Sequence, residues 1–262
     1  MKKVEKDHLK NSVINTMLDH KSIRSYKDEI PSDEEIESIV RAAQQAPFVS
    51  QLYSVILSRE KDEHPFDAPL LFTICADFHK FEVIMKKRGW EPVTNDLSIL
   101  FFALQDACYA AQNMVTAGES IGIGSCFLGA APYKAKKLKE KYDIPDKVFP
   151  IVQLAMGYPD EDPSPRPRYP MEYVLFEEEY PELTDEMIES AMKEMDEGYL
   201  DQDYYRKLDA KLAVQGNEED EYTYDDYSWT EHISRKWGQW YKDVEQLLEQ
   251  LEKCGFDITR EE

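Results

Sequence analysis

The sequence is poor in basic residues and has no long uncharged hydrophobic run. Its 262 residues include 31 Lys and Arg against 53 Asp and Glu, so its formal net charge at pH 7 is -22. Nucleic acids and anionic membranes repel such a protein, and we expect neither as a partner. No run approaches the roughly 18 apolar residues of a membrane span, and no apolar stretch follows the first charged residues, as a secretion signal would require. We therefore expect a cytoplasmic protein.

Cysteine is scarce as well. Cys75, Cys108, Cys126 and Cys254 lie far apart in the sequence, which leaves no CxxC metal site and indicates no disulfide framework. Three of them lie inside apolar stretches, so we expect reduced thiols in the core and no metal site. The chain also has no internal repeats. Since 42% of its residues are hydrophobic, it can form one globular domain with appendages.

The stretch 95–130 is the one around which we expect the fold to be organised. Asn95 is a good helix N-cap, and apolar residues then recur at three- and four-residue spacing until Gly118, where we expect the helix to end. Asp106 is the only charged residue in its interior, which predicts a helix buried on nearly all sides. Residues 122–130 predict a short buried strand whose glycines allow a close approach to the backbone. Taken alone, the pattern indicates only a core helix and a core strand.

Hydrophobic periodicity predicts the remaining elements. A capping box of Ser32 and Glu35 begins a helix that Pro47 ends. Further helices are predicted at 9–19 and 134–142, and strands at 53–57, 70–76 and 149–157.

Two basic clusters stand out in so acidic a chain. In the segment 20–26, three potentially cationic side chains lie among serine hydroxyls, which suits an anion because Lys and Arg supply charge-assisted donors. Arg166 and Arg168 lie two residues apart in a proline-rich segment, where both can face the same way toward a phosphate. A solvated turn explains the first cluster equally well. A proline-rich surface connection with incidental arginines explains the second equally well.

The order of these segments resembles the nitroreductase family of flavin enzymes. The resemblance is carried by His20-Lys-Ser-Ile-Arg-Ser-Tyr26, the helix end at Ala46-Pro47, the strand 122–129 and the Pro-Arg-Pro-Arg segment. The tail from Tyr227 to Ile233 is most similar to the branch of the oxygen-insensitive NADPH nitroreductase and flavin reductase P. The similarity extends from about residue 12 to residue 256.

The resemblance implies an α+β fold in which helices surround a mixed, mostly antiparallel sheet. It implies an intertwined homodimer with FMN bound at the subunit interface. We expect residues 1–175 to form this FMN-binding core, and residues 176–262 to form a helical extension that packs on the same domain.

The resemblance also implies a set of cofactor contacts. Residues matching the family between 20 and 24 would contact the FMN phosphate, ribityl chain and pyrimidine edge, and the pair at 166 and 168 would contact the phosphate. The backbone of 127–129 would lie along the isoalloxazine, and residues 50 and 51 belong to a loop from the partner subunit. The full set is His20, Lys21, Ser22, Arg24, Ser50, Gln51, Phe127, Leu128, Gly129, Arg166 and Arg168.

The activity implied is that of an FMN-dependent oxidoreductase that takes hydride from NAD(P)H and reduces nitroaromatics, quinones or flavins by a ping-pong mechanism. We expect FMN rather than FAD, because the basic clusters suit one terminal phosphate and no Gly-x-Gly-x-x-Gly turn is present. The flavin performs the chemistry, so no catalytic residue is assigned. Lys21 and Arg24 would stabilise anionic reduced flavin. Two alternatives stay open: a specialised flavin enzyme, such as a reductive dehalogenase or one with another donor, and a non-catalytic flavin-binding or interaction protein.

The sequence departs from the family in three places. Phe48, Val49 and Tyr53 stand where polar residues are usual, and the connection 59–68 is shorter than in the similar branch, so we expect a more open or differently covered site. The segment 217–226 contains six acids where that branch has a basic loop that favours NADPH. A preference for NADPH is therefore not carried over, and we expect an acidic disordered loop without a ligand.

Overall fold

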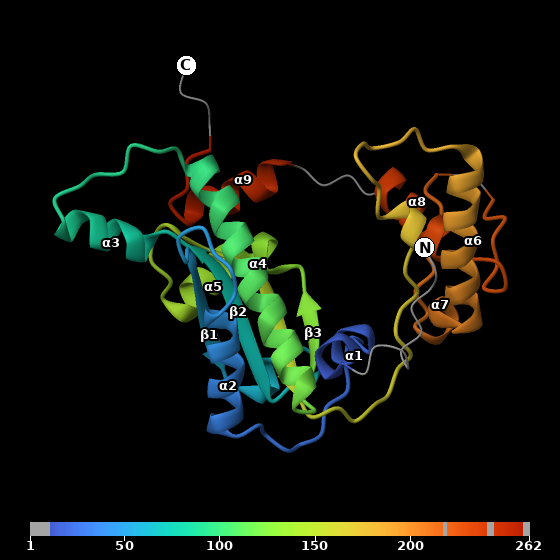
Figure 1. The fold of residues 1–262 in the computed structure, drawn as a ribbon, viewed down its shortest axis with the longest axis horizontal. Coiled ribbons are helices and arrows are strands. Elements are labelled where there is room, and N and C mark those ends of the chain that lie inside the picture. Colours follow the sequence, from blue (N-terminus) through green and yellow to red (C-terminus); the bar gives the residue numbers. More distant parts are fainter. Residues whose placement is uncertain (1–10, 217–218, 240–243, 259–262) are drawn as a thin grey trace. The chain divides into compact units, whose positions relative to one another are not determined.

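The computed structural model describes residues 11–216, 219–239 and 244–258, which form two compact units (Figure 1). The core unit contains the described residues up to 163 and residues 244–258, and the helical unit contains those from 164 to 239. This division differs from the expected one at residue 175. Residues 244–258 return to the core unit because Leu251 and Phe256 are buried in its main hydrophobic cluster.

A four-stranded antiparallel sheet lies at the centre of the core unit. Its strands are β1 (Tyr53–Ser58), β2 (Leu70–Asp77), β3 (Gly124–Leu128) and β4 (Val148–Gly157), in the order β1-β2-β4-β3. Every residue of β2 is buried, as its continuous apolar sequence requires. All four strands confirm the sequence expectation to within about two residues at each end.

The helices of the core unit are α1 (Ser12–Leu18), α2 (Asp33–Gln44), α3 (His79–Lys87), α4 (Asp96–Ser120), α5 (Ala135–Tyr142) and α9 (Val244–Lys253). Of these, α4 packs along the sheet and α5 contacts β4, whereas α3 has no buried residue. Figure 1 shows α2 beside α4, and α4 running along the sheet. The predicted helices near 9–19, 32–46, 96–118 and 134–142 are confirmed, although residues 9 and 10 lie outside the described part of the chain. Short 3-10 turns occupy Lys61–Glu63, Pro65–Asp67, Ala131–Lys134 and Met171–Tyr173.

The start of α2 shows why local sequence predicted it well. The Ser32 backbone N–H donates to the Glu35 carboxylate at 2.8 Å, and the Glu35 N–H donates to the Ser32 hydroxyl at 3.3 Å. This reciprocal capping box satisfies two backbone donors that have no partner within the helix. The predicted capping box is confirmed.

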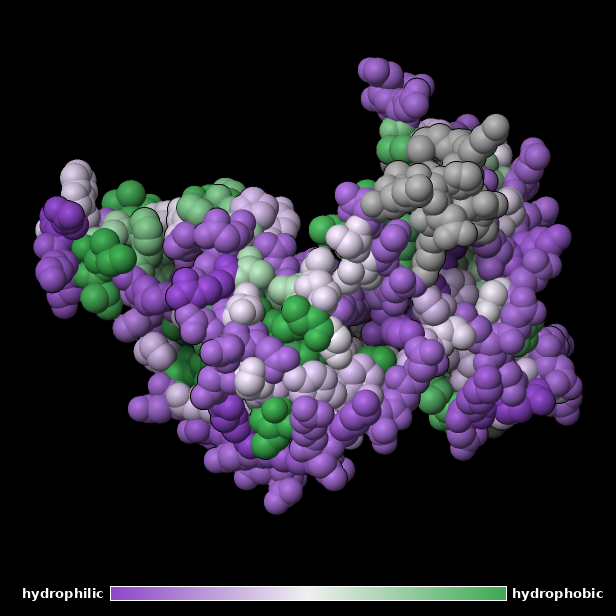
Figure 2. Space-filling view, turned by 60° about the horizontal axis from the view of Figure 1, so that its bottom comes forward, coloured by the Kyte–Doolittle hydropathy of each residue, from purple (hydrophilic) through white to green (hydrophobic). Residues whose placement is uncertain are grey.

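The burial predicted for α4 is wrong for one of its faces. Leu97 and Phe101 are 58% and 65% exposed, whereas Ala107 and Met114 on the opposite side are fully buried. Cys108 is also exposed, so the expectation of a core thiol fails at this position, while the other three cysteines are buried. The apolar surface of α4 is therefore larger than the area that the sheet and α2 can bury. Figure 2 shows hydrophobic areas within a largely hydrophilic surface.

The end of α4 also differs from the expectation. Gly118 does not stop the helix, which continues to Ser120, and it is Gly122 that has the left-handed φ of +84°. A Cβ atom at Gly118 would lie 2.5 Å from Cε of Met156. The glycine therefore allows α4 to pack closely on β4.

The helical unit contains α6 (Asp185–Asp201), α7 (Tyr204–Lys207) and α8 (Trp229–Gln239). Its small core combines Met195 with the aromatic rings of Tyr199, Tyr205 and Tyr227. Thr184 caps α6 by accepting a hydrogen bond from the Met187 N–H at 3.4 Å.

The acidic segment was expected to be disordered, and this is wrong for residues 219–226; residues 217 and 218 lie outside the described chain. Asp220 accepts two hydrogen bonds from the buried Arg235 guanidinium, at 2.7 and 2.9 Å, and pairs with Lys211 at 2.8 Å. Arg235 and then Lys211 hold the pKa of the Asp220 carboxyl well below its usual range. The Arg206 guanidinium donates a hydrogen bond to the Asp225 carboxylate. Cations elsewhere in the helical unit therefore order the segment.

No helix among the described residues combines the length and the apolar character needed to cross a membrane.

Candidate functional site

The segment 20–26 extends the sheet of the core unit. Ser22 forms a parallel bridge with Ser125 of β3, and the Ile23 N–H donates to the Ser125 carbonyl at 2.8 Å. Tyr26 then forms an antiparallel bridge with Pro159, just beyond β4. One basic cluster therefore lies along an edge strand, and the parallel bridge makes the pairing around the sheet mixed, as expected.

Gly124 explains how the segment can approach β3 so closely. A Cβ atom at this position would lie 2.6 Å from Cγ1 of Ile23 and 2.9 Å from Cγ of Pro159. The glycine thus admits the chain's own Ile23. At Gly129, beyond the other end of β3, an added Cβ would have no neighbour within 4 Å. Of these two glycines, only Gly129 leaves open space beside the strand.

Two acidic residues occupy the donors of the basic segment. The Lys21 ammonium group pairs with Asp162, and the backbone N–H groups of Arg24 and Ser25 both donate to Oε1 of Glu161, the second at 3.1 Å. We call the Lys21 ammonium group and these two N–H groups the anion cradle. Because they already bind carboxylates, the arrangement favours an anion site over a solvated turn.

The last turn of α4 fixes the beginning of the basic segment. Nδ1 of His20 lies 2.6 Å from Oε1 of Glu119, and both side chains are largely buried. Beside them opens a pocket of about 500 Å³, lined in part by Asn15, Lys21 and Ile23. Lys21 of the anion cradle therefore borders a space large enough for part of a small molecule.

The loop that carries Ser50 and Gln51 is held by a residue that sequence reasoning did not assign to the site. Three of its backbone N–H groups, those of Val49, Ser50 and Leu52, donate to the carboxylate of Asp106. The available signal was that Asp106 is the single charge inside an apolar helix. Phe48 and Val49 are half-exposed, so the departures noted in the sequence lie on the surface of this loop.

The end of β3 presents the backbone that the resemblance places along a flavin ring. Phe127 is 39% exposed, Leu128 is half-buried, and Gly129 is exposed. The preceding Cys126 is buried, which raises the pKa of its thiol despite the opposing charge of Arg24. A neutral thiol is a poor nucleophile, so Cys126 serves as packing here.

The second basic pair lies in the helical unit. Nη1 of Arg166 donates to Gln202 at 3.0 Å, and the guanidinium centre lies 3.8 Å from the centroid of the Tyr204 ring. Nη1 of Arg168 donates to the carbonyl groups of Arg166 and Pro167. These contacts orient both arginines within their own unit. The other candidate residues all belong to the core unit.

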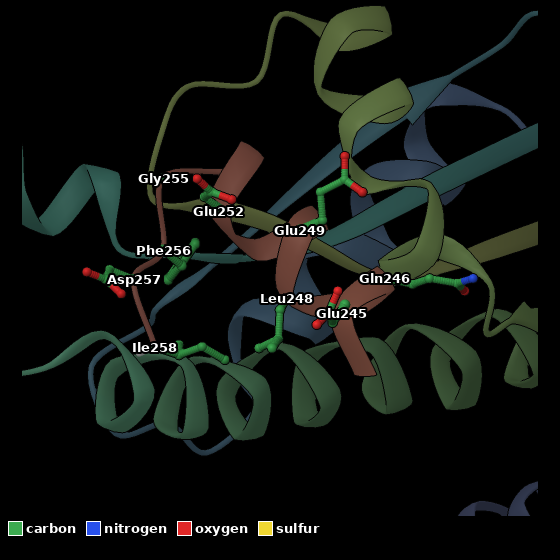
Figure 3. A pocket seen from close by; sticks show the side chains of 9 residues that line it. All are labelled: Glu245, Gln246, Leu248, Glu249, Glu252, Gly255, Phe256, Asp257 and Ile258. Carbon is green, nitrogen blue, oxygen red and sulfur yellow. The ribbon is translucent and has the colours of Figure 1, made fainter. Parts of the chain in front are cut away.

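A different pocket, of about 900 Å³, lies at α9 and the segment after it. Figure 3 shows Leu248 and Ile258 directed toward α4, with Glu249 and Glu252 directed away from it. Its carboxylates would repel a phosphate, so it does not fit a flavin nucleotide. Among the described residues, no group of three His, Cys, Asp or Glu side chains is arranged to bind a metal ion.

Comparisons with known proteins identify a family to which the chain is similar. The model of the Nitroreductase family matches residues 17–63 and 56–158. The FMN reductase (NADPH) of Bacillus subtilis is 32% identical over 213 residues, which cover 75% of this chain and 84% of the relative. The oxygen-insensitive NADPH nitroreductase of Salmonella typhimurium is 26% identical over 71% of this chain and 82% of its own length.

The similarity extends to three-dimensional structure. The NfrA1 nitroreductase from B. subtilis superposes with a TM-score of 0.77 and 26% identity, covering 93% of this chain and 98% of that one. The expected fold, helices around a mixed and mostly antiparallel sheet, is confirmed, and so is the resemblance noted in the sequence. The chain belongs to the nitroreductase family.

Proposed function

We propose that this protein is an FMN-dependent oxidoreductase that takes hydride from NAD(P)H and reduces nitroaromatics, quinones or flavins in a ping-pong cycle. The family and the names of the two relatives, an FMN reductase and a nitroreductase that use NADPH, support the cofactor, the donor and the class of acceptor. In the acidic segment 219–226, Asp220 and Asp225 are paired with cations of the same unit, so these two carboxylates give no ground against NADPH.

The anion cradle is the observation that carries this proposal. Carboxylate and phosphate are oxyanions that bind the same kinds of donor: an ammonium group and backbone N–H groups. Glu161 and Asp162 bind these donors of the core unit. The residues present therefore fit the terminal phosphate of FMN.

The remaining candidate residues would orient the cofactor. The segment 20–24 would hold the phosphate, ribityl chain and pyrimidine edge, and the backbone of 127–129 would support the ring beside the open space at Gly129. Ser50 and Gln51 offer a hydroxyl and an amide, and Arg166 and Arg168 would add guanidinium donors to the phosphate. When bound, FMN supplies the hydride acceptor and donor. Arg24 would contribute positive charge that favours the reduced, anionic form.

We also propose a homodimer, with twice the 30.6 kDa mass of the chain. The exposed face of α4 supports this assembly. It presents the large apolar side chains of Leu97, Phe101, Phe102 and Tyr109. Such a surface is usually buried against a partner, and a second copy is the partner that two-fold symmetry provides.

A cytoplasmic location is part of the same proposal. Cys75, Cys126 and Cys254 are buried free thiols. Reducing compartments maintain thiols in this form, which supports the assignment.

An anaerobic titration tests the function. Protein reconstituted with FMN should lose the absorbance of oxidised flavin when NADPH or NADH is added under nitrogen, and should regain it with a nitroaromatic or a quinone. Bound flavin that neither nucleotide bleaches would instead identify a flavin-binding protein without this turnover or one with a different donor. Failure to bind FMN at all would contradict the proposal.

A further inference from the structure

Asp106 is a buried carboxylate in the middle of α4, with only 1% of its surface exposed. A buried charge is costly unless it is satisfied by hydrogen bonds or by an opposite charge. Asp106 is satisfied by three backbone N–H groups, all from residues 49–52, which lie more than fifty positions away in the sequence. Its role therefore concerns that loop rather than α4 itself.

The three hydrogen bonds surround one residue of unusual conformation. The Val49 N–H donates to Oδ1 at 2.6 Å, and the N–H groups of Ser50 and Leu52 donate to Oδ2 at 3.1 and 2.9 Å. Between Ser50 and Leu52 lies Gln51, which has a φ of +56°. A residue with a Cβ atom rarely adopts this left-handed conformation unless its surroundings enforce it. One carboxylate fixes the backbone on both sides of Gln51.

The side chains of this loop remain available while its backbone is held. Gln51 is exposed and Ser50 is half-buried, so both side chains can contact another molecule. The N–H groups of Val49, Ser50 and Leu52 already bind Asp106. Another residue of α4, Asn113, fixes the neighbouring end of α2 by donating to the Ala42 carbonyl at 3.0 Å. Asn113 thus holds the helix before the loop, and Asp106 holds the loop itself.

We propose that Asp106 is a positioning residue of the flavin site. Its carboxylate sets the conformation of residues 49–52 so that Ser50 and Gln51 contact bound FMN, although Asp106 itself does not touch the cofactor. This inference rests on the proposed function. A purely structural role would instead use the same hydrogen bonds only to fix the entry into β1.

Two variants on α4 distinguish these roles. Asp106→Asn keeps the shape of the side chain but replaces one acceptor oxygen with a donor, so at least one loop N–H loses its partner. Asn113→Ala, the matched control, removes a hydrogen bond to the end of α2 and leaves residues 49–52 attached. Hydrogen exchange of the Val49, Ser50 and Leu52 amides reports on the loop, and fluorescence titration of the apoprotein with FMN reports on the site.

Asp106→Asn should speed exchange at these amides and weaken FMN binding about tenfold, whereas Asn113→Ala should leave the FMN dissociation constant within about twofold of the wild type. If Asp106→Asn does not fold, Val49→Pro removes one of the same hydrogen bonds from an exposed loop position and should weaken FMN binding in the same direction.

The inference is overturned if the loop amides exchange faster and FMN binds as in the wild type, or if Asn113→Ala weakens binding equally. In both cases, FMN binding by the wild-type protein shows that the proposed function survives. Wild-type protein that does not bind FMN would overturn the proposed function and this inference together.

Discussion

The Ser25 backbone N–H donates to Oε1 of Glu161 at 3.1 Å, so a carboxylate of the chain itself occupies the anion cradle. A phosphate that binds there must displace this carboxylate. Hydrogen bonds and ion pairs of exposed groups contribute about 0.2 to 1 kcal/mol, so Glu161→Gln should tighten FMN binding by about 1.4- to 5-fold. Glu37→Gln is the control for charge, because Glu37 pairs with Arg41 on α2. Weaker FMN binding in Glu161→Gln would mean that Glu161 supports the site instead of competing for it.

Gly124 should tolerate no side chain. Its added Cβ would lie 2.6 Å from Ile23 and 2.9 Å from Pro159, so Gly124→Ala should lower the free energy of unfolding by about 1 to 3 kcal/mol through overpacking. Gly129→Ala, with nothing within 4 Å, should leave the stability of the flavin-free protein unchanged. Denaturant unfolding of both apoproteins provides the comparison. Equal stabilities would show that the segment 20–26 does not pack on β3 in this way.

The pair of Asp220 and Arg235 should make the helical unit sensitive to acid. The pKa of Asp220 lies below its usual value of 3.8 in the folded protein. The pair therefore stabilises the fold above that value, and the stabilisation is lost as the pH falls through the folded pKa. Between about pH 5 and pH 2, Asp220→Asn should flatten the decline in stability. A slope unchanged in Asp220→Asn would contradict the assignment.

Mixed dimers should show which protomer's flavin the loop 49–52 contacts. If the loop reaches the partner's flavin, a dimer of one Asp106→Asn chain and one Arg24→Ala chain has one site with both changes and one with neither. Differently tagged chains, purified as the mixed dimer, should then bind one FMN with wild-type affinity. If the loop serves its own protomer, both sites carry one change and neither reaches that affinity. The titration stoichiometry separates the two outcomes.

Local patterns predicted most of the core unit. The Ser32–Glu35 capping box and the apolar periodicity of α4 involve residues a few positions apart, so the sequence contains the whole signal. The parallel bridge between Ser22 and Ser125 leaves no such local signal in the sequence, because it joins segments about a hundred residues apart. For the same reason, no sequence window connects Asp106 to the loop that it holds.

The errors have equally specific causes. Gly118 looked like a helix stop because glycine often ends helices, but its lack of a side chain serves contact with Met156. The segment 219–226 looked disordered because its own composition contains the acids and not their partners, Arg235 and Lys211. α3 escaped prediction, since its sequence mixes apolar and charged residues without a marked cap. The exposed face of α4 cannot be told from a buried one by composition alone.

Fluorescence titration of the apoprotein with FMN tests the central claim most directly, because it asks whether the two basic clusters bind one cofactor. Charge-assisted hydrogen bonds contribute about 1.5 to 3 kcal/mol, so Arg24→Ala and Arg166→Ala should each weaken FMN binding by about 10- to 150-fold. Lysine at either position should restore only part of the affinity, because it lacks the planar fork of donors. An unchanged dissociation constant in both alanine variants would contradict the account, since the phosphate would then bind elsewhere.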